Sequence, residues 1–217
     1  MADNVKNNYF KIKEDLPSSV TLVAASKMQN IEKIEELFSV APDIVFGENK
    51  VQELCDKYDA RFKWHLIGQL QTNKVKYIID KVELIQSLDR TSLALEIEKQ
   101  AAKRDIVMPC LVEINIAGEE AKGGLKPEEA DEFINWASGL KHIKICGLMT
   151  VAPNASDDVV RECFLKMKNL FDALRIKYKD MDVLSMGMSG DWKLAVECGS
   201  NMIRLGRTLF GERNYNV

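Results

Sequence analysis

The stretch "TLVAASKMQN", residues 21–30, decides how the chain folds. It is an apolar, β-branched run that ends in a lysine, and an amphipathic pattern follows it. Such a run indicates a buried strand followed by a helix. Lys27 then stands at the end of a buried strand, as either a solvated rim residue or a partly desolvated amine. A desolvated amine is nucleophilic and forms Schiff bases with aldehydes and ketones.

The pattern of the first strand recurs along the chain. Strand-like runs alternate with helical patterns, and we expect strands at 20–26, 43–47, 63–68, 82–89, 107–117, 143–151, 182–188 and 201–206. Seven helices are expected between them, and a further helix is expected within residues 1–15. Alternation of this kind implies a parallel sheet covered by helices.

Eight strands favour closure into a (β/α)8 barrel with an extra N-terminal helix, and residues 1–217 are expected to form a single domain. An open doubly wound sheet is the alternative, and it would require two or three of these strands to be false. The loop "AGEEAKGGLKPEE" (117–129) is a candidate mobile flap or a simple solvated loop.

The composition narrows the function classes. The 217 residues are 46% hydrophobic and carry a net charge of −3, so nucleic acid is not an expected partner. No window is apolar enough to suggest a membrane helix, and no signal peptide is evident. The five cysteines include no CxxC pair and there are two histidines, which predicts a cytoplasmic protein with reduced thiols and no metal site.

In barrels of this class, chemistry collects at the carboxyl ends of the strands. "SMGMSGD" (185–191) and "RLGRTLFG" (204–211) are glycine-containing turns after the seventh and eighth strands. Ser189 is expected at the start of the helix that follows the first of these turns, and Gly206 opens a run of N–H donors in the second. Two such turns predict a phosphate cradle. With the lysine, they suggest a bound phosphorylated aldehyde, either pyridoxal phosphate or a phosphosugar held by a Schiff-base aldolase.

Seven motifs carry a family resemblance that spans residues 5 to 213. They are "VAASK" (23–27), "FGENKVQE" (46–53), "WHLIGQLQTNK" (64–74), "QSLDR" (86–90), "VEINIAGEEAKGG" (112–124), "GLMTV" (147–151) and "LSMGMSGDWKLAVECGSNMIRLGRTLFGER" (184–213). In order and spacing, these motifs resemble the YggS/PROSC family of pyridoxal phosphate homeostasis proteins.

The resemblance implies a barrel similar to the N-terminal domain of alanine racemase, with pyridoxal 5′-phosphate held as a Schiff base on Lys27. It implies that Arg204 faces the pyridine nitrogen and that Asn49 lies near the phenolic oxygen. Ser189 and the backbone N–H groups around Gly206 and Arg207 would hold the phosphate. The family most often has a small hydroxyl residue where this chain has Arg207, so the role of that side chain stays open between a phosphate contact and a solvated position.

The resemblance favours a carrier that acts in vitamin B6 homeostasis without catalytic residues. The alternative is a weak amino-acid racemase. Racemases of the similar fold use a tyrosine from a second domain, and none of the five tyrosines here, including Tyr215, is an evident replacement. His65 is expected to be a core histidine. A monomer is expected, and apo-enzymes that depend on pyridoxal phosphate are candidate partners.

Overall fold

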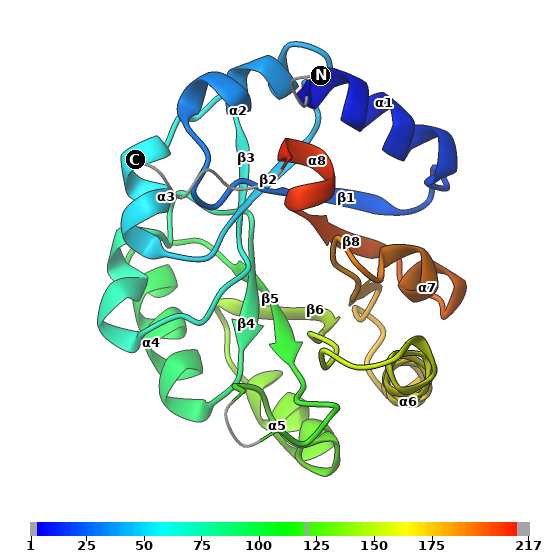
Figure 1. The fold of residues 1–217 in the computed structure, drawn as a ribbon. Coiled ribbons are helices and arrows are strands. Elements are labelled where there is room, and N and C mark those ends of the chain that lie inside the picture. The colour runs from blue at the N-terminus through cyan, green and yellow to red at the C-terminus, as the bar shows by residue number, and fades with distance from the viewer. Residues whose placement is uncertain (1–3, 120–121, 212–217) are drawn as a thin grey trace.

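The structure, a computed structural model, describes residues 4–119 and 122–211. Its strands are parallel and close into a barrel in chain order, so the predicted (β/α)8 fold is confirmed (Figure 1). The strands are β1 (Thr21–Ala25), β2 (Val45–Glu48), β3 (Lys63–Leu66), β4 (Leu84–Leu88), β5 (Met108–Glu113), β6 (Ile143–Met149), β7 (Val183–Ser185) and β8 (Met202–Leu205).

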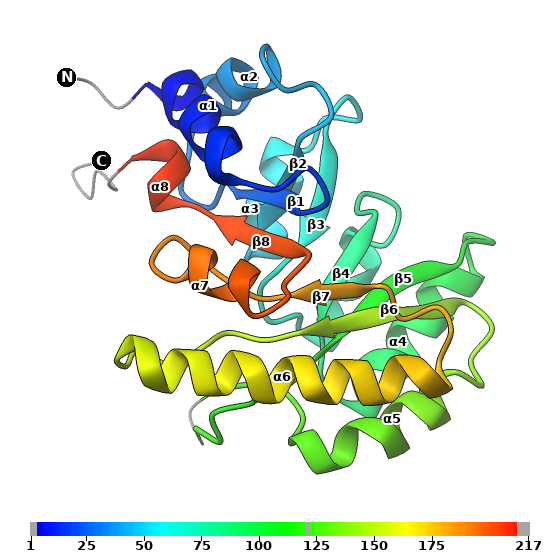
Figure 2. The same cartoon turned by 90° about the vertical axis from the view of Figure 1, so that its right-hand side faces the viewer.

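Helices surround the barrel, and Figure 2 shows α6 lengthwise on its outside with α7 beside it. The α-helices are α1 (Val5–Asp15), α2 (Ile31–Phe38), α3 (Val51–Lys57), α4 (Thr91–Ala102), α5 (Ala130–Ala137), α6 (Asp157–Lys177), α7 (Trp192–Glu197) and α8 (Arg207–Phe210). The expected N-terminal helix is therefore present, and it packs against α2 and α8. Between β3 and β4 the connection is a 3-10 helix, η1 (Thr72–Tyr77), and a second 3-10 turn, η2 (Pro127–Glu129), precedes α5.

Alternation along the strands separates an inner core from an outer one. On β1, Leu22 and Ala24 belong to the outer core, which packs against the helices. Val23 belongs to the cluster that fills the barrel, and the buried members of that cluster are Val23, Leu84, Leu111, Met149 and Met202. Side chains two residues apart share a face of a strand. Val23 and Ala25 therefore share the inward face, and Lys27 follows in the turn directly after the strand.

Strand register brings distant segments together at the mouth of the barrel. Ala25 pairs with Gly47 on one side, and Ala24 pairs with Leu205 on the other. The residues that follow these pairs emerge side by side, because carboxyl ends of parallel strands share one end of a barrel. The N-terminal strand, the "FGEN" segment and the "RLGR" segment thus meet around Lys27.

Part of the segment that the sequence left open between a mobile flap and a solvated loop is tied back onto β5. The backbone N–H of Asn115 donates to Leu125 at 2.9 Å, and that of Leu125 donates to Glu113 at 2.8 Å. Residues 120 and 121 of this segment, the last two residues of the final sequence motif and Tyr215 lie outside the described residues. No helix within the described part of the chain is long and apolar enough to cross a membrane.

Candidate functional site

A cavity of about 600 Å³ opens at the carboxyl ends of the strands. The structure brings together all the residues that the sequence singled out, because the cavity is lined by Lys27, Asn49, Ser189, Arg204, Gly206 and Arg207. They come from the ends of β1, β2, β7 and β8. The amine of Lys27 and the two glycine-containing turns therefore line the same cavity.

Lys27 is half-buried and lies in a short connection whose backbone is unusual. The next residue, Met28, has φ of 60°, a left-handed conformation that non-glycine residues seldom adopt. Ser26, on the other side, is fully buried. The predicted placement of the lysine at the barrel mouth is confirmed, and the chain on both sides of it is sharply constrained.

The two turns converge on Ser189, although not in the way the sequence suggested. We expected the Ser189 hydroxyl at the start of α7, but Asp191 occupies the N-cap position of that helix. Ser189 Oγ instead accepts hydrogen bonds from the backbone N–H groups of Gly206 and Thr208, both at 3.2 Å. The expectation was wrong because the turn carries Ser189 across to the loop after β8, whose backbone N–H groups donate to its hydroxyl.

Thr208 was missed in the sequence, although it stands inside the "RLGRTLFG" motif. Its hydroxyl donates to the carbonyl of Ser189 at 3.2 Å and ties the two loops together. The resemblance called for a small hydroxyl residue at position 207, where this chain has arginine. The hydroxyl of Thr208, one position later, could therefore have singled this residue out. Arg207 itself is exposed and lines the cavity.

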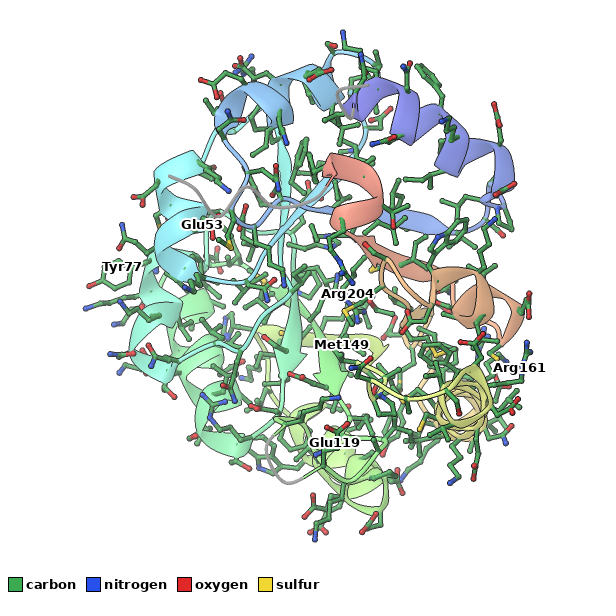
Figure 3. All side chains as sticks on the ribbon, viewed as in Figure 1. Glu53, Tyr77, Glu119, Met149, Arg161 and Arg204 are labelled. Atoms are coloured by element: carbon green, nitrogen blue, oxygen red, sulfur yellow. The ribbon has the colours of Figure 1, made fainter. Side chains whose placement is uncertain are left out.

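Arg204 is held in the barrel interior, and Figure 3 shows it near the centre of the ring of strands. It is 4% exposed. Its guanidinium donates to Ser185 Oγ at 2.5 Å and to the carbonyl of Thr150 at 2.8 Å. Burial lowers the pKa of Arg204 to about 10, and the nearby carboxylates of Glu113 and Asp191 oppose that decrease. The side chain therefore remains a cation at neutral pH.

Behind Arg204, a chain of buried polar side chains runs across the barrel. Ser185 Oγ donates to Gln86 Oε1 at 2.7 Å, and Gln86 Nε2 lies 3.0 Å from His65 Nδ1. Because the amide oxygen accepts from Ser185, the amide nitrogen donates and Nδ1 accepts. Burial lowers the pKa of His65 to about 3, so the ring is neutral. His65 is a core histidine with a hydrogen-bond partner, as expected.

Glu113 is a titratable group that the sequence reasoning missed. Burial, together with the charge of Asp89, raises the pKa of Glu113 to about 7, while Arg204 acts in the opposite direction. Glu113 ends β5, and its position at a strand end could have singled it out. Among the described residues, no group of three or more histidine, cysteine, aspartate or glutamate side chains could hold a metal ion.

The residues present fit a small phosphorylated aldehyde. The backbone N–H groups of Gly206 and Thr208 converge on the hydroxyl of Ser189 at the wall of the cavity, and the loops after the seventh and eighth strands are the usual phosphate site of such barrels. Lys27 supplies an amine and Arg204 a fixed donor within the same cavity. A phosphate, a carbonyl and a ring acceptor could each meet a suitable partner.

Fold and site together define a class: a closed (β/α)8 barrel with a lysine after β1 and a cavity lined by the loops after β7 and β8. The sequence profile of the alanine racemase N-terminal domain family matches residues 2–214. The chain belongs to this family and, within it, to the pyridoxal phosphate homeostasis proteins.

Relatives and solved structures agree with this placement. The chain is 46% identical over 200 residues to the pyridoxal phosphate homeostasis protein of Aquifex aeolicus, covering 89% of this chain and 87% of the relative. PipY of Synechococcus elongatus with pyridoxal phosphate bound is 29% identical, has a TM-score of 0.88, and is matched over 95% of this chain and 100% of that chain. An alanine racemase of Clostridium difficile has a TM-score of 0.82 at 17% identity over 99% of this chain and 57% of that chain, which shows a shared fold.

Proposed function

We propose that this chain binds pyridoxal 5′-phosphate as a Schiff base on Lys27 and acts in the homeostasis of this cofactor. The observation that carries the proposal is the shared cavity, in which Lys27 and the converging donors around Ser189 line one enclosure. When bound, the cofactor supplies an aldehyde that reacts with amines and a ring that can accept electrons. We extend the proposal to residues 1–217 acting as one binding domain.

The cavity residues divide the cofactor between them in this proposal. Ser189 and the backbone N–H groups of Gly206 and Arg207 bind the phosphate, and the Arg207 guanidinium adds positive charge at the cavity rim. Arg204 donates to the pyridine nitrogen, and Asn49 lies near the phenolic oxygen. Arginine can only donate hydrogen bonds, so the ring nitrogen stays unprotonated and the ring withdraws electrons weakly.

We further propose that the protein holds the cofactor without catalytic turnover. None of the described residues that line the cavity is a histidine or a tyrosine; its acid–base groups besides Lys27 are Asp191, whose carboxylate accepts from the backbone N–H of Met188, and Lys122, whose ammonium pairs with Glu119. A carrier of this kind would act in the cytoplasm as a monomer. Its partners would be apo-enzymes that take up pyridoxal phosphate.

The test is reduction of the purified protein with borohydride after loading with pyridoxal 5′-phosphate. Reduction fixes a Schiff base as a stable secondary amine, and peptide mapping then locates the modified lysine. We expect the label on Lys27 and loss of the visible imine band in Lys27→Ala. Lys122 lines the same cavity, so Lys122→Ala is the matched control and should keep the band.

An unchanged imine band in Lys27→Ala would refute the assignment of the lysine. The absence of catalysis is tested separately by isotope exchange at the Cα atom of a panel of amino acids. We expect no exchange above the rate with free cofactor. Turnover at about 1 s⁻¹ or faster, within the usual range of enzymes, would overturn the carrier proposal in favour of a racemase.

A further inference from the structure

An ion cluster lies on the outer side of the barrel wall, directly behind the connection that carries Lys27. Lys57, the last residue of α3, donates from Nζ to Glu48 Oε1 at 3.0 Å and to Glu53 Oε1 at 2.7 Å. The same ammonium donates to the carbonyl of Ser26 at 2.8 Å. Figure 3 marks Glu53 beside α3, away from Arg204 at the centre of the barrel.

The cluster fixes the chain on each side of Lys27. Before the lysine, Ser26 is held twice: its carbonyl accepts from Lys57, and its hydroxyl donates to Glu48 Oε1 at 2.7 Å. After the lysine, the backbone N–H of Met28 donates to Glu53 Oε1. The left-handed conformation of Met28 is therefore stabilised by the same carboxylate that binds Lys57.

The cluster is not expected to stabilise the fold better than apolar side chains would. The Glu48 side chain is fully buried and that of Lys57 is 12% exposed, so both charges have lost most of their hydration. Replacing a buried ion pair by apolar side chains is often neutral or stabilising. Glu48 Oε2 also lacks a hydrogen-bond partner, which adds to the cost. What the charges achieve here, and apolar groups could not, is directed bonding to the backbone of two residues.

We propose that Lys57, together with Glu48 and Glu53, forms a positioning cluster that fixes the backbone around Lys27 and so aligns its amine with a phosphate-anchored aldehyde. This inference rests on the proposed function. In the step concerned, the lysine nitrogen and the aldehyde carbon form a C=N bond, and the aldehyde oxygen leaves with two amine hydrogens as water. The cluster acts on that bond, whereas the phosphate is held by other residues, at Ser189 and in the loop after β8.

The test compares two ligands that differ in the reacting group alone. Pyridoxal 5′-phosphate carries the aldehyde, and pyridoxine 5′-phosphate carries an alcohol in its place. For Lys57→Met we expect affinity for the aldehyde to fall about tenfold or more, because small misalignments of reacting groups have large effects. Affinity for the alcohol should change less than about twofold by the same reasoning, since it needs no aligned amine. Lys57→Arg, which can donate to the same acceptors, should restore most of the loss.

Lys63→Met is the matched control. Lys63 begins β3 at the other end of the barrel, and its ammonium pairs with Asp43 at 3.1 Å. This variant should leave the affinities for both ligands unchanged. Glu53→Ala is a second probe if Lys57→Met does not fold, because it removes the acceptor of the Met28 N–H at a side chain that is 21% exposed. It should show the same selective loss for the aldehyde.

The outcomes separate this inference from the proposed function. An equal fall in affinity for both ligands would mean that the cluster supports the whole cavity. Unchanged affinity for the aldehyde would mean that the cluster does not position Lys27. Either result overturns this inference and leaves the proposed function standing. If the wild-type protein binds pyridoxal 5′-phosphate without a reducible imine, the proposed function and this inference both fail.

Discussion

Replacement of Gln86 by leucine should destabilise the protein from within the barrel. Gln86 is fully buried on β4, and its amide joins Ser185 to His65 at 2.7 Å and 3.0 Å. Leucine has a similar volume, so the substitution removes hydrogen bonds without opening a large cavity. It leaves the Ser185 hydroxyl without its acceptor and His65 Nδ1 without its donor.

The expected cost follows from those two groups. A buried polar group left without a partner costs about 1–3 kcal/mol, which gives a range of about 2–6 kcal/mol for the pair. Leucine is more apolar than glutamine and recovers about 1–2 kcal/mol by burial. The free energy of unfolding should therefore fall by about 3 kcal/mol, a large part of the 5–15 kcal/mol that is typical of a folded domain.

Urea denaturation of the protein without cofactor measures this change. Gln52→Leu is the control, because Gln52 is exposed on α3 and its amide donates to Asp56 at 2.8 Å. The control should shift stability by less than about 0.5 kcal/mol. In the double variant with His65→Leu, the loss should be smaller than the sum of the single losses, since one orphaned group disappears. No loss of stability in Gln86→Leu, or a gain, would refute the reasoning.

Three further predictions concern other parts of the barrel. In Gly147→Ala, the new Cβ would lie 1.8 Å from the carbonyl oxygen of Val183. We therefore expect the free energy of unfolding to fall by more than about 4 kcal/mol, with little soluble protein. In Gly190→Ala, the control, the Cβ meets nothing within 4 Å, and expression should be normal. The pKa of Glu113 rises from its ordinary 4.5 to about 7 in the folded protein. Between these two pH values the folded protein keeps a proton that the unfolded chain releases. The resulting stabilisation is present below pH 4.5 and is lost as the pH rises to 7. Glu113→Gln lacks this loss, and urea titrations should show its stability relative to wild type improving by about 3 kcal/mol between pH 4.5 and 7; a constant difference would contradict the assignment. Arg204→Lys cannot make two forked donations at once, so bound pyridoxal 5′-phosphate should dissociate about tenfold faster in stopped-flow trapping, and an unchanged rate would exclude a role for the guanidinium.

The barrel and its mouth were predictable because the sequence marks where strands end. Most of the apolar runs end at a glycine or a charged residue, and a parallel barrel places the ends of all its strands on one side. Lys27 and Gly206 could thus be brought together without any knowledge of contacts. The connection at 72–77 was harder, because a 3-10 helix of six residues is longer than usual and the sequence pattern does not separate it from an α-helix.

The chain behind Arg204 could not be predicted for a different reason. All five residues of β4 are buried, since one face of the strand packs inside the barrel and the other against helices. Alternation of apolar and polar residues, which normally tells the inner face from the outer, is therefore lost. In "LIQSL" both Gln86 and Ser87 are polar and buried, and only the register of the closed barrel shows that Gln86 points inward.

The contacts of Glu48, on the outer side of the barrel wall, could not be predicted from the sequence either. Glu48 follows Gly47 in the "FGEN" motif, and its neighbour Asn49 lines the cavity, so the motif suggests that Glu48 also serves the ligand. Strand alternation sends it outward instead, where it meets Lys57 nine residues later. Which residue of a short helix reaches a buried carboxylate depends on how the helix is rotated on the sheet, and that rotation is set by packing.

In the proposed function, the phosphate, the ring and the amine of Lys27 are each held by a separate arrangement of residues. The phosphate end depends on backbone N–H groups near Ser189, which no substitution at Lys57 removes. Arg204 depends on the chain through Ser185 inside the barrel, and Lys27 depends on bonds outside it. Binding energy from the phosphate can therefore persist when the imine is weakened. A protein that must both retain and release pyridoxal phosphate would benefit from this separation, because hydrolysis of one C=N bond frees the aldehyde while the phosphate remains held.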